Sequence, residues 1–570
     1  MTQNSCRARM KPNAILIFTG SASSPFNHAG KMKKEIEDVI KKDVLIDMME
    51  IEKELMWTLR MECYDNYPES LPKLLQCVKW SSAEHVSQIR LLLQTWRFDL
   101  MEVESALDLL DYKFPDTAVR KLAVKVLDRL SDNDLEMYLL HLVQALKYES
   151  YMDCDLARYL LTRALNNRRI GHFLFWHLKA EVTGPEHSVQ FSLLLELYCR
   201  GAREHIDILR KQVECINKLK TVTEILQNSA GSDNNAKVSM MKECFMGAAY
   251  VKAFSNVFSP LDPTVKLKTL KPNKCKILDS KKKPLWLVFE NNDEEGDDVL
   301  IIFKNGDDLR QDNLTLLCMR LMDSVWKNAG LDYSLNIYRC LPTGPMVGLI
   351  EVVHPSCTLG EIQADKAGTF AGVWKDFTLY QYLQEKSDNS EEKCRTFIDN
   401  FTLSVIGYSI ATYVLGIGDR HNDNIMIKSD SGELFHIDFG HFLGNIKRKF
   451  GMKREFTKFV LTDDILYVIN KLGKHNEELF KEKCIDAFKV LRSKGNLFIS
   501  VFALLLRTGI PELEVPEDLD YLQKSLALDK DEPDAIKHFK DVYKEAYDNR
   551  GKTTMNWMIH NVAHRWVGGQ

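Results

Sequence analysis

The stretch LGIGDRHNDNIM, residues 415–426, and the stretch LFHIDFGHFLGN, residues 434–445, carry the most informative pattern in the chain. The first ends and the second begins with a short apolar run suited to a strand, and Ser431-Gly432 between the runs suits a tight turn. The pattern predicts a β-hairpin with Asn424 at its start and Asp438 at its end, so that the two side chains meet. Such a pair of oxygen ligands suits Mg²⁺, which commonly takes one or two protein side chains and keeps waters and phosphate oxygens for the rest.

Each part of this pattern, taken alone, has an ordinary structural explanation. An Asp-Phe-Gly tripeptide such as 438–440 is weak, an Asn before an apolar run is usually a cap or a turn, and a His among apolar residues usually belongs to a core. Phosphoryl transfer, however, needs a cation clamp on the phosphates, oxygen ligands for the metal and a group that positions or deprotonates the attacking hydroxyl. The order and spacing of Asp419, His421, Asn424 and Asp438 together indicate that chemistry.

A candidate for the cation clamp lies upstream, in the stretch FKNGDDLRQD at residues 303–312. Lys304 closes a strand-like run, Val299–Phe303, and can hold an ATP phosphate as a point charge. Asp312, eight residues later, can hold that lysine in place. The alternative for Lys304 is an ordinary exposed lysine at a strand end, which is the common case for lysine.

A candidate phosphate loop, Asp279–Lys283, lies between two predicted strands. Ser280 offers hydroxyl and backbone donors, and Lys282 can face phosphate; the alternative is a solvated hairpin turn. No GxGxxG or GxxxxGK[ST] pattern precedes Lys304, so the sequence has neither a protein-kinase glycine loop nor a Walker A loop.

Two kinds of pattern divide the chain. From about residue 45 to 215 apolar residues recur at helical spacing, and Ser131 with Asp134 reads as a capping box between two helices. Short helices joined by short polar turns predict an α-solenoid. Residues 231–235 form the clearest linker, and beyond them 284–290 and 299–303 predict a hairpin, 347–353 another strand, and the chain after about 375 more helices.

Composition limits the remaining possibilities. The 570 residues are 45% apolar and 27% charged, which is typical of a globular chain with more than one folding unit. The net charge of −4 gives no global preference for nucleic acid, so any polyanion site must be a local cluster. The thirteen cysteines show no CxxC pair, which favours reduced thiols in a cytosolic protein. The longest apolar stretch, Leu497–Leu506, is shorter than the ~20 residues of a membrane span, so we expect a soluble protein.

These motifs resemble the catalytic subunit of a class I phosphoinositide 3-kinase. The resemblance covers about residues 45 to 570 and rests on 303–312, 415–426 and 434–445, while the stretch NRRIGHFLFWHL at 167–178 resembles the helical domain of that family. DSKKKPLW at 279–286 and SLALDK at 525–530 look closer to the beta and delta isoforms.

The fold that the resemblance implies is multidomain, α and α+β: an α-solenoid helical domain followed by a two-lobed phosphoinositide-kinase catalytic domain. The expected segments are an N-terminal tail at 1–22, the helical domain at 23–215, a helical connection and linker at 216–270, the catalytic domain at 271–555 with its N-lobe to about 353, and a C-terminal membrane-contact helix at 556–570.

The resemblance also implies roles for individual residues. Asn424 and Asp438 become the Mg²⁺ ligands, with Mn²⁺ as the alternative ion, and Lys304 becomes the phosphate lysine held by Asp312. Asp419 and His421 form the catalytic-loop pair, and His441 is the alternative to His421 for activating the lipid hydroxyl or stabilising the transferred group, since small shifts move the pKa of a histidine across working pH. The adenine hinge is Glu351-Val352-Val353. The residues expected around ATP are Ser280, Lys282, Trp286, Lys304, Asp312, Tyr338, Ile350, Glu351, Val353, Met426, Ile437 and Asp438.

The segment 447–454 is basic at five of eight positions and follows the metal site, where the acceptor must enter. A charge run is usually a solvated face, but an inositol head group needs paired cations, and arginine grips phosphate bidentately. The residues are Lys447, Arg448, Lys449, Lys453 and Arg454. The hypothesis is transfer to the 3-hydroxyl of phosphatidylinositol 4,5-bisphosphate, with phosphatidylinositol and its 4-phosphate as further substrates. The chain departs from the family in having REFTKF at 454–459 instead of RERVPF and Asn313 instead of Met, which puts substrate preference in question more than catalysis.

Two surfaces suggest partners. Trp557 lies on an apolar face near the C-terminus that suits a membrane interface, and the alternative is docking against the kinase lobe. Asp47, Glu50 and Glu52 correspond to an acidic patch that a Src-homology-2 regulatory adaptor contacts in the family; the alternative is a solvated first turn of a helix. The implied location is the cytoplasm, with recruitment to the inner face of the plasma membrane.

The adaptor-binding, Ras-binding and β-sandwich domains with which class I subunits begin are not recognisable here, so a fragment, a truncated gene model or a reduced family member is expected. A protein Ser/Thr kinase of the same superfamily and an inactive helical scaffold are the competing functions. The basic segment argues against the first, and retention of Lys304, Asp419, His421, Asn424 and Asp438 argues against the second.

Overall fold

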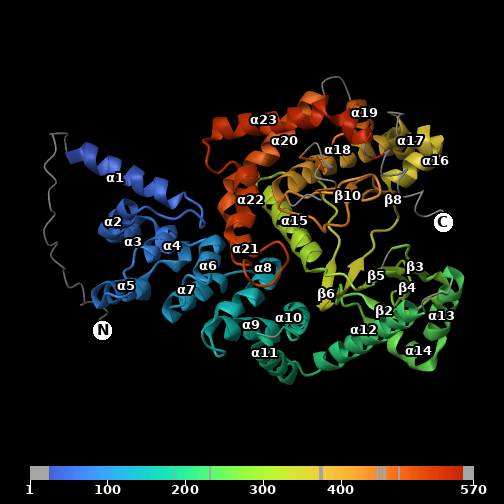
Figure 1. The fold of residues 1–570 in the computed structure, drawn as a ribbon, viewed down its shortest axis with the longest axis horizontal. Coiled ribbons are helices and arrows are strands. Elements are labelled where there is room, and N and C mark those ends of the chain that lie inside the picture. The colour runs from blue at the N-terminus through green and yellow to red at the C-terminus, as the bar shows by residue number, and fades with distance from the viewer. Residues whose placement is uncertain are drawn as a thin grey trace.

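A stack of helices forms the N-terminal half of the chain in the computed structural model (Figure 1). The structure describes residues 25–184, 186–229, 233–280, 282–371, 377–444, 448–449, 452–453, 458–472, 476–555 and 557, with the backbone alone at 25–31, 366–371, 448–449, 452–453 and 472. The helices before the first strand are α1 (Pro25–Ile40), α2 (Glu50–Thr58), α3 (Arg60–Asn66), α4 (Leu71–Gln76), α5 (Ala83–Thr95), α6 (Val103–Leu109), α7 (Thr117–Leu127), α8 (Asp132–Ala145), α9 (Asp155–Asn166), α10 (Arg168–Glu181), α11 (Ser188–Gly201), α12 (His205–Asn228), α13 (Asn234–Met246) and α14 (Ala248–Phe254).

Local signals explain where these helices begin and which face they bury. The Asp116 carboxylate accepts from the N–H of Ala118 at 2.8 Å and caps α7, while the Ser131 hydroxyl accepts from the N–H of Asp134 at 3.2 Å and caps α8. The apolar stripe of α7 is buried as its spacing predicts. The largest side chain of the stack, Trp176 on α10, is fully buried.

The 24-residue helix α12 connects the stack to the sheet that follows. The Gln212 amide on α12 donates to the carbonyl of Phe258 in β1 at 2.9 Å. Near its other end, the Asn305 amide donates to the Thr223 hydroxyl at 2.8 Å, and the Gln227 amide donates to the carbonyl of Asn305 at 3.3 Å. The middle and the C-terminal end of α12 are therefore bound to the sheet.

The sheet is a curled antiparallel one with the strand order β1-β2-β4-β5-β7-β6, and β3 pairs with β4 beside this path. The expected hairpin at 284–303 is confirmed, since β4 and β5 pair from Leu285↔Phe303 to Phe289↔Val299. The expected strand at 347 is β7. The strands are β1 (Val257–Phe258), β2 (Lys266–Leu270), β3 (Lys276–Ile277), β4 (Leu285–Asn291), β5 (Val299–Asn305), β6 (Cys340–Gly344) and β7 (Val347–Glu351), with helix α15 (Arg310–Asn328) between β5 and β6.

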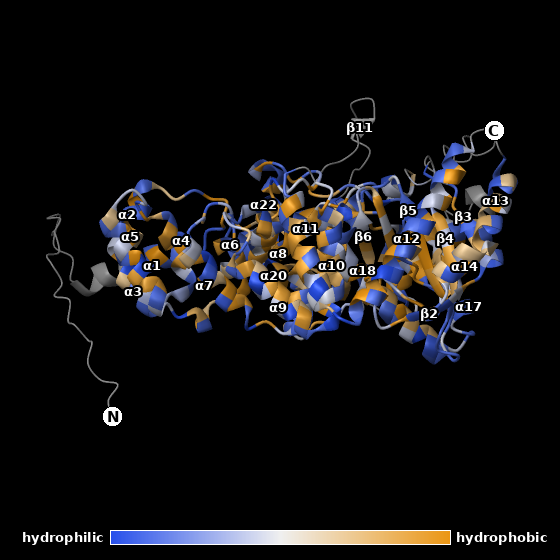
Figure 2. Ribbon diagram, turned by 90° about the horizontal axis from the view of Figure 1, so that it is seen from below, coloured by the Kyte–Doolittle hydropathy of each residue, from blue (hydrophilic) through white to orange (hydrophobic). Residues whose placement is uncertain are grey.

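The remainder is mostly helical and contains two small sheets. Its elements are β8 (Ser356–Thr358), α16 (Leu359–Ala371), α17 (Thr378–Lys386), α18 (Glu391–Leu415), β9 (Ile425–Lys428), β10 (Leu434–His436), β11 (Arg448–Lys449), β12 (Met452–Lys453), α19 (Asp463–Ile469), α20 (Asn476–Ser493), α21 (Gly495–Ala503), α22 (Asp520–Leu526) and α23 (Glu532–Asp548). Apolar residues gather where this part meets the helical stack, around α8, α10, α18 and α20 (Figure 2). A helical domain followed by a sheet lobe and a helical lobe confirms the expected fold class.

The helical stack contacts the C-terminal lobe directly. The Lys147 ammonium at the end of α8 donates to the carbonyl of Thr508 at 2.6 Å and pairs with Glu181 at 2.8 Å, and the Tyr148 hydroxyl donates to the carbonyl of Leu506. The cysteines within the described ranges are free thiols, as their spacing led us to expect. Among the described residues, no helix has the length and apolar character needed to cross a bilayer.

Candidate active site

The predicted hairpin is present and holds the two candidate metal ligands close together. β9 and β10 pair in the register Ile425↔His436, and the N–H of Ile437 donates to the carbonyl of Asn424 at 3.0 Å. Asn424 and Asp438 therefore leave the two strands side by side.

The local contacts of Asn424 fix its side chain and still suit a cation. Its amide donates to the carbonyl of Asp419 at 2.5 Å, and its Oδ1 accepts from the N–H of His421 at 2.9 Å. A carbonyl oxygen has two lone pairs, so one remains for a metal ion. Within the described ranges no three His, Cys, Asp or Glu side chains gather around a common point, so Asn424 with Asp438 is the donor set on offer, and it fits an ion that keeps waters and phosphate oxygens.

The backbone is strained at both carboxylates of the site. Asp419 has φ +57° and Asp438 has φ +61°, in the left-handed region that non-glycine residues rarely occupy. Such conformations cost of the order of 1–3 kcal/mol each, and they persist where surrounding contacts fix them, often at functional sites.

Arg420 is the organising residue that the sequence pattern missed. Its guanidinium donates to the carbonyls of Gly418 at 3.0 Å, Ile437 at 2.7 Å and Asp438, and it lies 5.7 Å from the ring of Phe439. It thereby joins the 418–424 loop to the 437–439 loop. A rigid guanidinium with five donors suits several carbonyls at once, but carbonyls leave no trace in a sequence.

Lys304 and Asp312 are placed differently from the prediction. The Lys304 ammonium lies 3.8 Å from Asp307, and Asp312 has no ion pair with it within 4.0 Å. Asp312 instead accepts from the N–H of Phe439 at 3.0 Å. Burial raises the pKa of this carboxyl, and Lys304 is close enough to act in the opposite direction. The expectation that Asp312 holds Lys304 directly was wrong, because the main chain after Asp438 occupies its carboxylate.

The candidate phosphate loop reaches the strand that carries Lys304. Lys282 extends over Gly306, where an added Cβ would lie 3.1 Å from its Cδ and 3.5 Å from its Nζ. The N–H of Lys283 donates to the carbonyl of Ser280 at 2.9 Å, so the loop is a turn with Ser280 and Lys282 exposed. Lys282 of the loop between β3 and β4 and Lys304 of β5 thus lie at the same end of the sheet.

Strand register aligns the predicted adenine-side residues on one face. Trp286 lies opposite Ile302, Ile302 lies opposite Ile350, and Lys304 lies opposite Gly348. Opposed residues share a face, and Trp286, Ile302, Lys304 and Ile350 are all half-buried while their strand neighbours Leu287, Phe303 and Leu349 are fully buried. This partly open face is the one that can receive a nucleotide.

The other predicted pocket residues come from the hinge and the second lobe. Among the hinge residues, the N–H of Glu351 donates to the carbonyl of Arg339 at 2.8 Å, and the N–H of Val352 donates to the carbonyl of Leu300 at 3.3 Å. Within the described ranges Val353 is the one of the three whose N–H has no partner. Met426 and Ile437 are half-buried beside β9 and β10.

Tyr338 lies behind this face. It is buried, its ring stacks on Phe439 with centroids 6.4 Å apart, and burial raises the pKa of its hydroxyl well above the usual range. Tyr338 therefore packs against the loop after Asp438 and supports it.

The two candidate histidines have different roles in the loop. The Nδ1 of His421 accepts from the N–H of Asp423 at 3.2 Å, which leaves Nε2 carrying the proton in the neutral ring. The carbonyl of His441 accepts from the N–H of Gly418 at 3.1 Å. His436, in contrast, is buried and stacked on Tyr408, and burial holds its pKa well below the usual range, so it is a neutral core residue.

Only part of the basic segment is described, and there only its backbone. Lys447 and Arg454 fall outside the described residues. Arg448 and Lys449 form β11 and Lys453 lies in β12, with Arg448 opposite Lys453. These backbone positions place three of the basic residues on one small hairpin.

Trp557 is buried, in contrast to the membrane-facing position predicted for it. Its side chain is 2% exposed, and its indole N–H donates to the carbonyl of Arg420 at 3.2 Å. In this arrangement Trp557 packs against the catalytic loop, as the docking alternative expects. Residues 558–570 lie outside the described residues.

The acidic patch is only partly available to a partner. Asp47 and Glu50 are exposed, and Glu50 pairs with Lys53 at 2.7 Å. Glu52 is occupied by the Lys42 ammonium at 2.5 Å and by the N–H of Met49 at 3.0 Å, which caps α2.

Comparison with known proteins finds a family match in each half of the chain. The accessory domain (PIK domain) of the phosphoinositide 3-kinase family matches residues 24–211, and the phosphatidylinositol 3- and 4-kinase domain matches residues 298–515. The second match contains Lys304, Asp419, Asn424 and Asp438.

Two similar proteins come from Dictyostelium discoideum. "Phosphatidylinositol 3-kinase 2" is 40% identical over 536 residues, which are 94% of this chain and 28% of that protein. "Phosphatidylinositol 3-kinase 1" is 40% identical over 539 residues, which are 94% of this chain and 33% of that protein. The chain thus spans a third or less of the length of these relatives.

Proposed function

We propose that this chain, which carries the helical accessory domain and the kinase domain of the phosphoinositide 3-kinase family, is an ATP-dependent lipid kinase of phosphoinositide-mediated signalling. The proposed reaction transfers the γ-phosphate of ATP to the 3-hydroxyl of phosphatidylinositol 4,5-bisphosphate, with phosphatidylinositol and its 4-phosphate as further acceptors. The observation that carries the proposal is the pairing of Asn424 with Asp438 at the ends of one hairpin, inside a domain that matches lipid kinases.

The residues of the chain divide the work of phosphoryl transfer. Lys304 and Lys282 offer positive charge to the phosphates from one end of the sheet. Asn424 and Asp438 would hold Mg²⁺ or Mn²⁺, which when bound neutralises charge on the phosphate oxygens. Arg420 keeps the two loops in register, so that the ligands are oriented before substrate arrives.

The two histidines take complementary roles in this proposal. Because Nδ1 of His421 is an acceptor, its Nε2–H is a donor, suited to the oxygens of the transferred phosphoryl group. His441 is then the group that takes the proton of the inositol hydroxyl. Asp419 positions Asn424 through its carbonyl.

Radiolabelled ATP turnover on vesicles of phosphatidylinositol, its 4-phosphate or its 4,5-bisphosphate tests the reaction, with product position determined by chromatography. We expect 3-phosphorylated product, most from the bisphosphate. A triple variant, Lys447→Gln with Arg448→Gln and Lys449→Gln, should lose the bisphosphate preference while still binding ATP. Unchanged bisphosphate turnover in that variant would contradict the head-group role, and transfer to protein alone would favour the protein-kinase alternative.

Membrane and adaptor contacts are part of the same proposal. We expect Trp557→Ala to leave ATPase activity in solution intact or raised and to weaken vesicle binding, if the segment after Thr554 undocks at a membrane. Flotation with anionic vesicles measures the second effect. Asp47 and Glu50 are the exposed acids that a Src-homology-2 adaptor could contact, whereas Glu52 is bound within the chain. Charge reversal at Glu50 should therefore weaken adaptor binding more than charge reversal at Glu52.

A further inference from the structure

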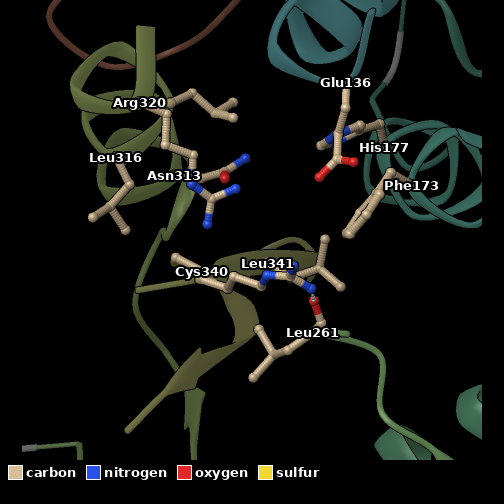
Figure 3. A pocket seen from close by; sticks show the side chains of 11 residues that line it. Glu136, Phe173, His177, Leu261, Asn313, Leu316, Arg320, Cys340 and Leu341 are labelled. Carbon is tan, nitrogen blue, oxygen red and sulfur yellow. Dashed lines mark hydrogen bonds between the residues drawn. The ribbon is translucent and has the colours of Figure 1, made fainter. Parts of the chain in front are cut away.

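A cavity lies between the helical stack and the sheet lobe, away from the catalytic loops (Figure 3). One wall is the face of α15 that carries Asn313 and Arg320, and the opposite wall is formed by Glu136 of α8 and His177 of α10. The cavity is partly open to solvent, and the space that the centre of a water-sized sphere can reach is about 30 Å³, which leaves room for a group of a few heavy atoms and not for a larger ligand. The remaining lining residues are Phe173, Leu261, Leu316, Leu317, Arg339, Cys340 and Leu341.

Two guanidinium groups line the cavity, and within the described ranges only that of Arg339 has an ion pair. Arg339 pairs with Asp262 at 2.7 Å and donates to the carbonyl of Leu261 at 3.1 Å. Glu136 on the far wall pairs with Arg169 at 3.0 Å.

Arg320 has no such neutralising partner. Within the described ranges its side chain makes one hydrogen bond, a long one of 3.4 Å to the carbonyl of Tyr338, and no carboxylate there approaches it to 4.0 Å. Burial and the neighbouring Arg339 lower the pKa of its guanidinium, while the carboxylates of Glu136 and Glu351, which lie too far away for an ion pair, act in the opposite direction with less effect. A partly buried cation without a counter-ion is costly, because desolvation is not repaid by pairing.

Asn313 adds a second unsatisfied donor on the same wall. Its side chain is 6% exposed, and its Nδ2 lacks a hydrogen-bond partner among the described residues. A buried donor left unpaired costs about 1–3 kcal/mol, and an apolar side chain of similar size would avoid this cost. Asn313 and Arg320 lie two turns apart on one face of α15 and both project toward the cavity (Figure 3).

We propose that this cavity binds a small oxyanion, a phosphate group or a carboxylate, between the guanidinium of Arg320 and the amide of Asn313. Two donors on one wall suit two oxygens of the same anion, and guanidinium groups bind such oxygens in pairs. Phe173 and Leu341 add apolar surface to the lining, which lowers the local dielectric and strengthens the contact. Glu136 does not oppose the anion strongly, since Arg169 already neutralises it.

The site adjoins the residues that support the catalytic loops. Arg320 contacts the carbonyl of Tyr338, whose ring stacks on Phe439, and Asp312 next to Asn313 accepts from the N–H of Phe439. An anion in the cavity would therefore contact the part of α15, and lie beside the residues before β6, that hold the loop after Asp438 in place. The proposal is independent of the substrate proposed above, and its test needs no turnover.

Thermal unfolding of the full chain in inorganic phosphate, at constant ionic strength set with chloride, measures binding directly. We expect Tm to rise and saturate with phosphate. In Asn313→Leu the apparent affinity should fall by about tenfold or more, because a hydrogen bond to a charged group is lost, while Tm without phosphate stays equal or rises. Lys304→Ala provides the control, since phosphate in the catalytic cleft would lose its effect there and phosphate in the cavity would not.

Arg320→Lys keeps the charge but not the paired donors, and should also weaken phosphate binding. The same titration with acetate in place of phosphate shows whether the cavity prefers a carboxylate or a phosphate group, since the two apparent affinities can be compared. Equal phosphate responses in the unmodified chain and Asn313→Leu, or a response abolished by Lys304→Ala, would overturn the proposal.

Discussion

The helical stack and the catalytic loops bury polar groups in opposite ways. In the stack, His141, His172 and His177 are buried, and burial lowers the pKa of the first to about 3 and of the other two to about 4, so they are neutral side chains among apolar ones. In the catalytic loops, Arg420 and Asn424 stay polar and bind main-chain carbonyls and N–H groups of other segments. These histidines of the stack are thus neutral core residues, although Arg120 in the same stack also binds main-chain carbonyls, whereas the polar side chains of the catalytic loops act mainly through directed bonds.

The largest effect should come from removing a charge at the site without disturbing the stack. Asp438→Asn removes the anionic metal ligand, so we expect turnover to fall about 1,000-fold or more, given the several kcal/mol that a metal supplies. Thermal unfolding should change little. A variant with substantial remaining activity would show that Asp438 is not a ligand.

The matching change in the stack should do the reverse. Trp176→Ala opens a cavity beside α10 and removes the indole contact to Gln212 at 3.3 Å. We expect the free energy of unfolding to fall by about 3–5 kcal/mol, measured by urea titration. Activity per folded molecule, measured well below the unfolding midpoint, should remain close to normal, and a large loss would mean that the two regions are more tightly coupled than their contacts indicate.

Arg420→Lys is a milder test of the hydrogen bonds that join the two catalytic loops. Lysine keeps the charge but cannot reach three carbonyls from one planar group, so the two loops lose their register. We expect turnover to fall about 10–100-fold, mainly in kcat, with far-ultraviolet circular dichroism unchanged. Unchanged activity would show that Arg420 does not fix the geometry of the two loops.

The smallest effect concerns pH. Both ring nitrogens of His141 lack partners among the described residues, and the folded pKa near 3 lies below the ~6.5 of an unfolded histidine. The unfolded chain therefore binds more protons between these values, so stability falls as pH drops below about 6.5. His141→Leu should be near neutral at pH 7 and gain about 1 kcal/mol over the unmodified chain at pH 5.5. Parallel pH dependences for both proteins would refute the neutral-histidine account.

The same contrast explains what could be read from the sequence. The stripe of α7, the β4–β5 hairpin and the β9–β10 hairpin follow from local periodicity and turn residues, so their positions were predictable. The partners of Asp312 and Trp557 were not, because each binds the main chain of a segment more than a hundred residues away. A main-chain group has no sequence signature.

The left-handed backbone at Asp419 and Asp438 was hidden for a related reason. A glycine would have indicated such a conformation in the sequence, and the chain has aspartate at both positions. The cavity beside Asn313 was equally hidden, although the departure at that position was visible.

The length of α12 has a mechanical consequence. Twenty-four residues make a rod about 36 Å long. His205 in its first turn bonds the Tyr198 hydroxyl of the helical stack at 2.7 Å, Gln212 bonds β1, and Thr223 near its last turns bonds Asn305, one residue beyond Lys304. One helix thus joins the stack to the strand that carries Lys304, so a displacement of the stack can be passed along it to that strand.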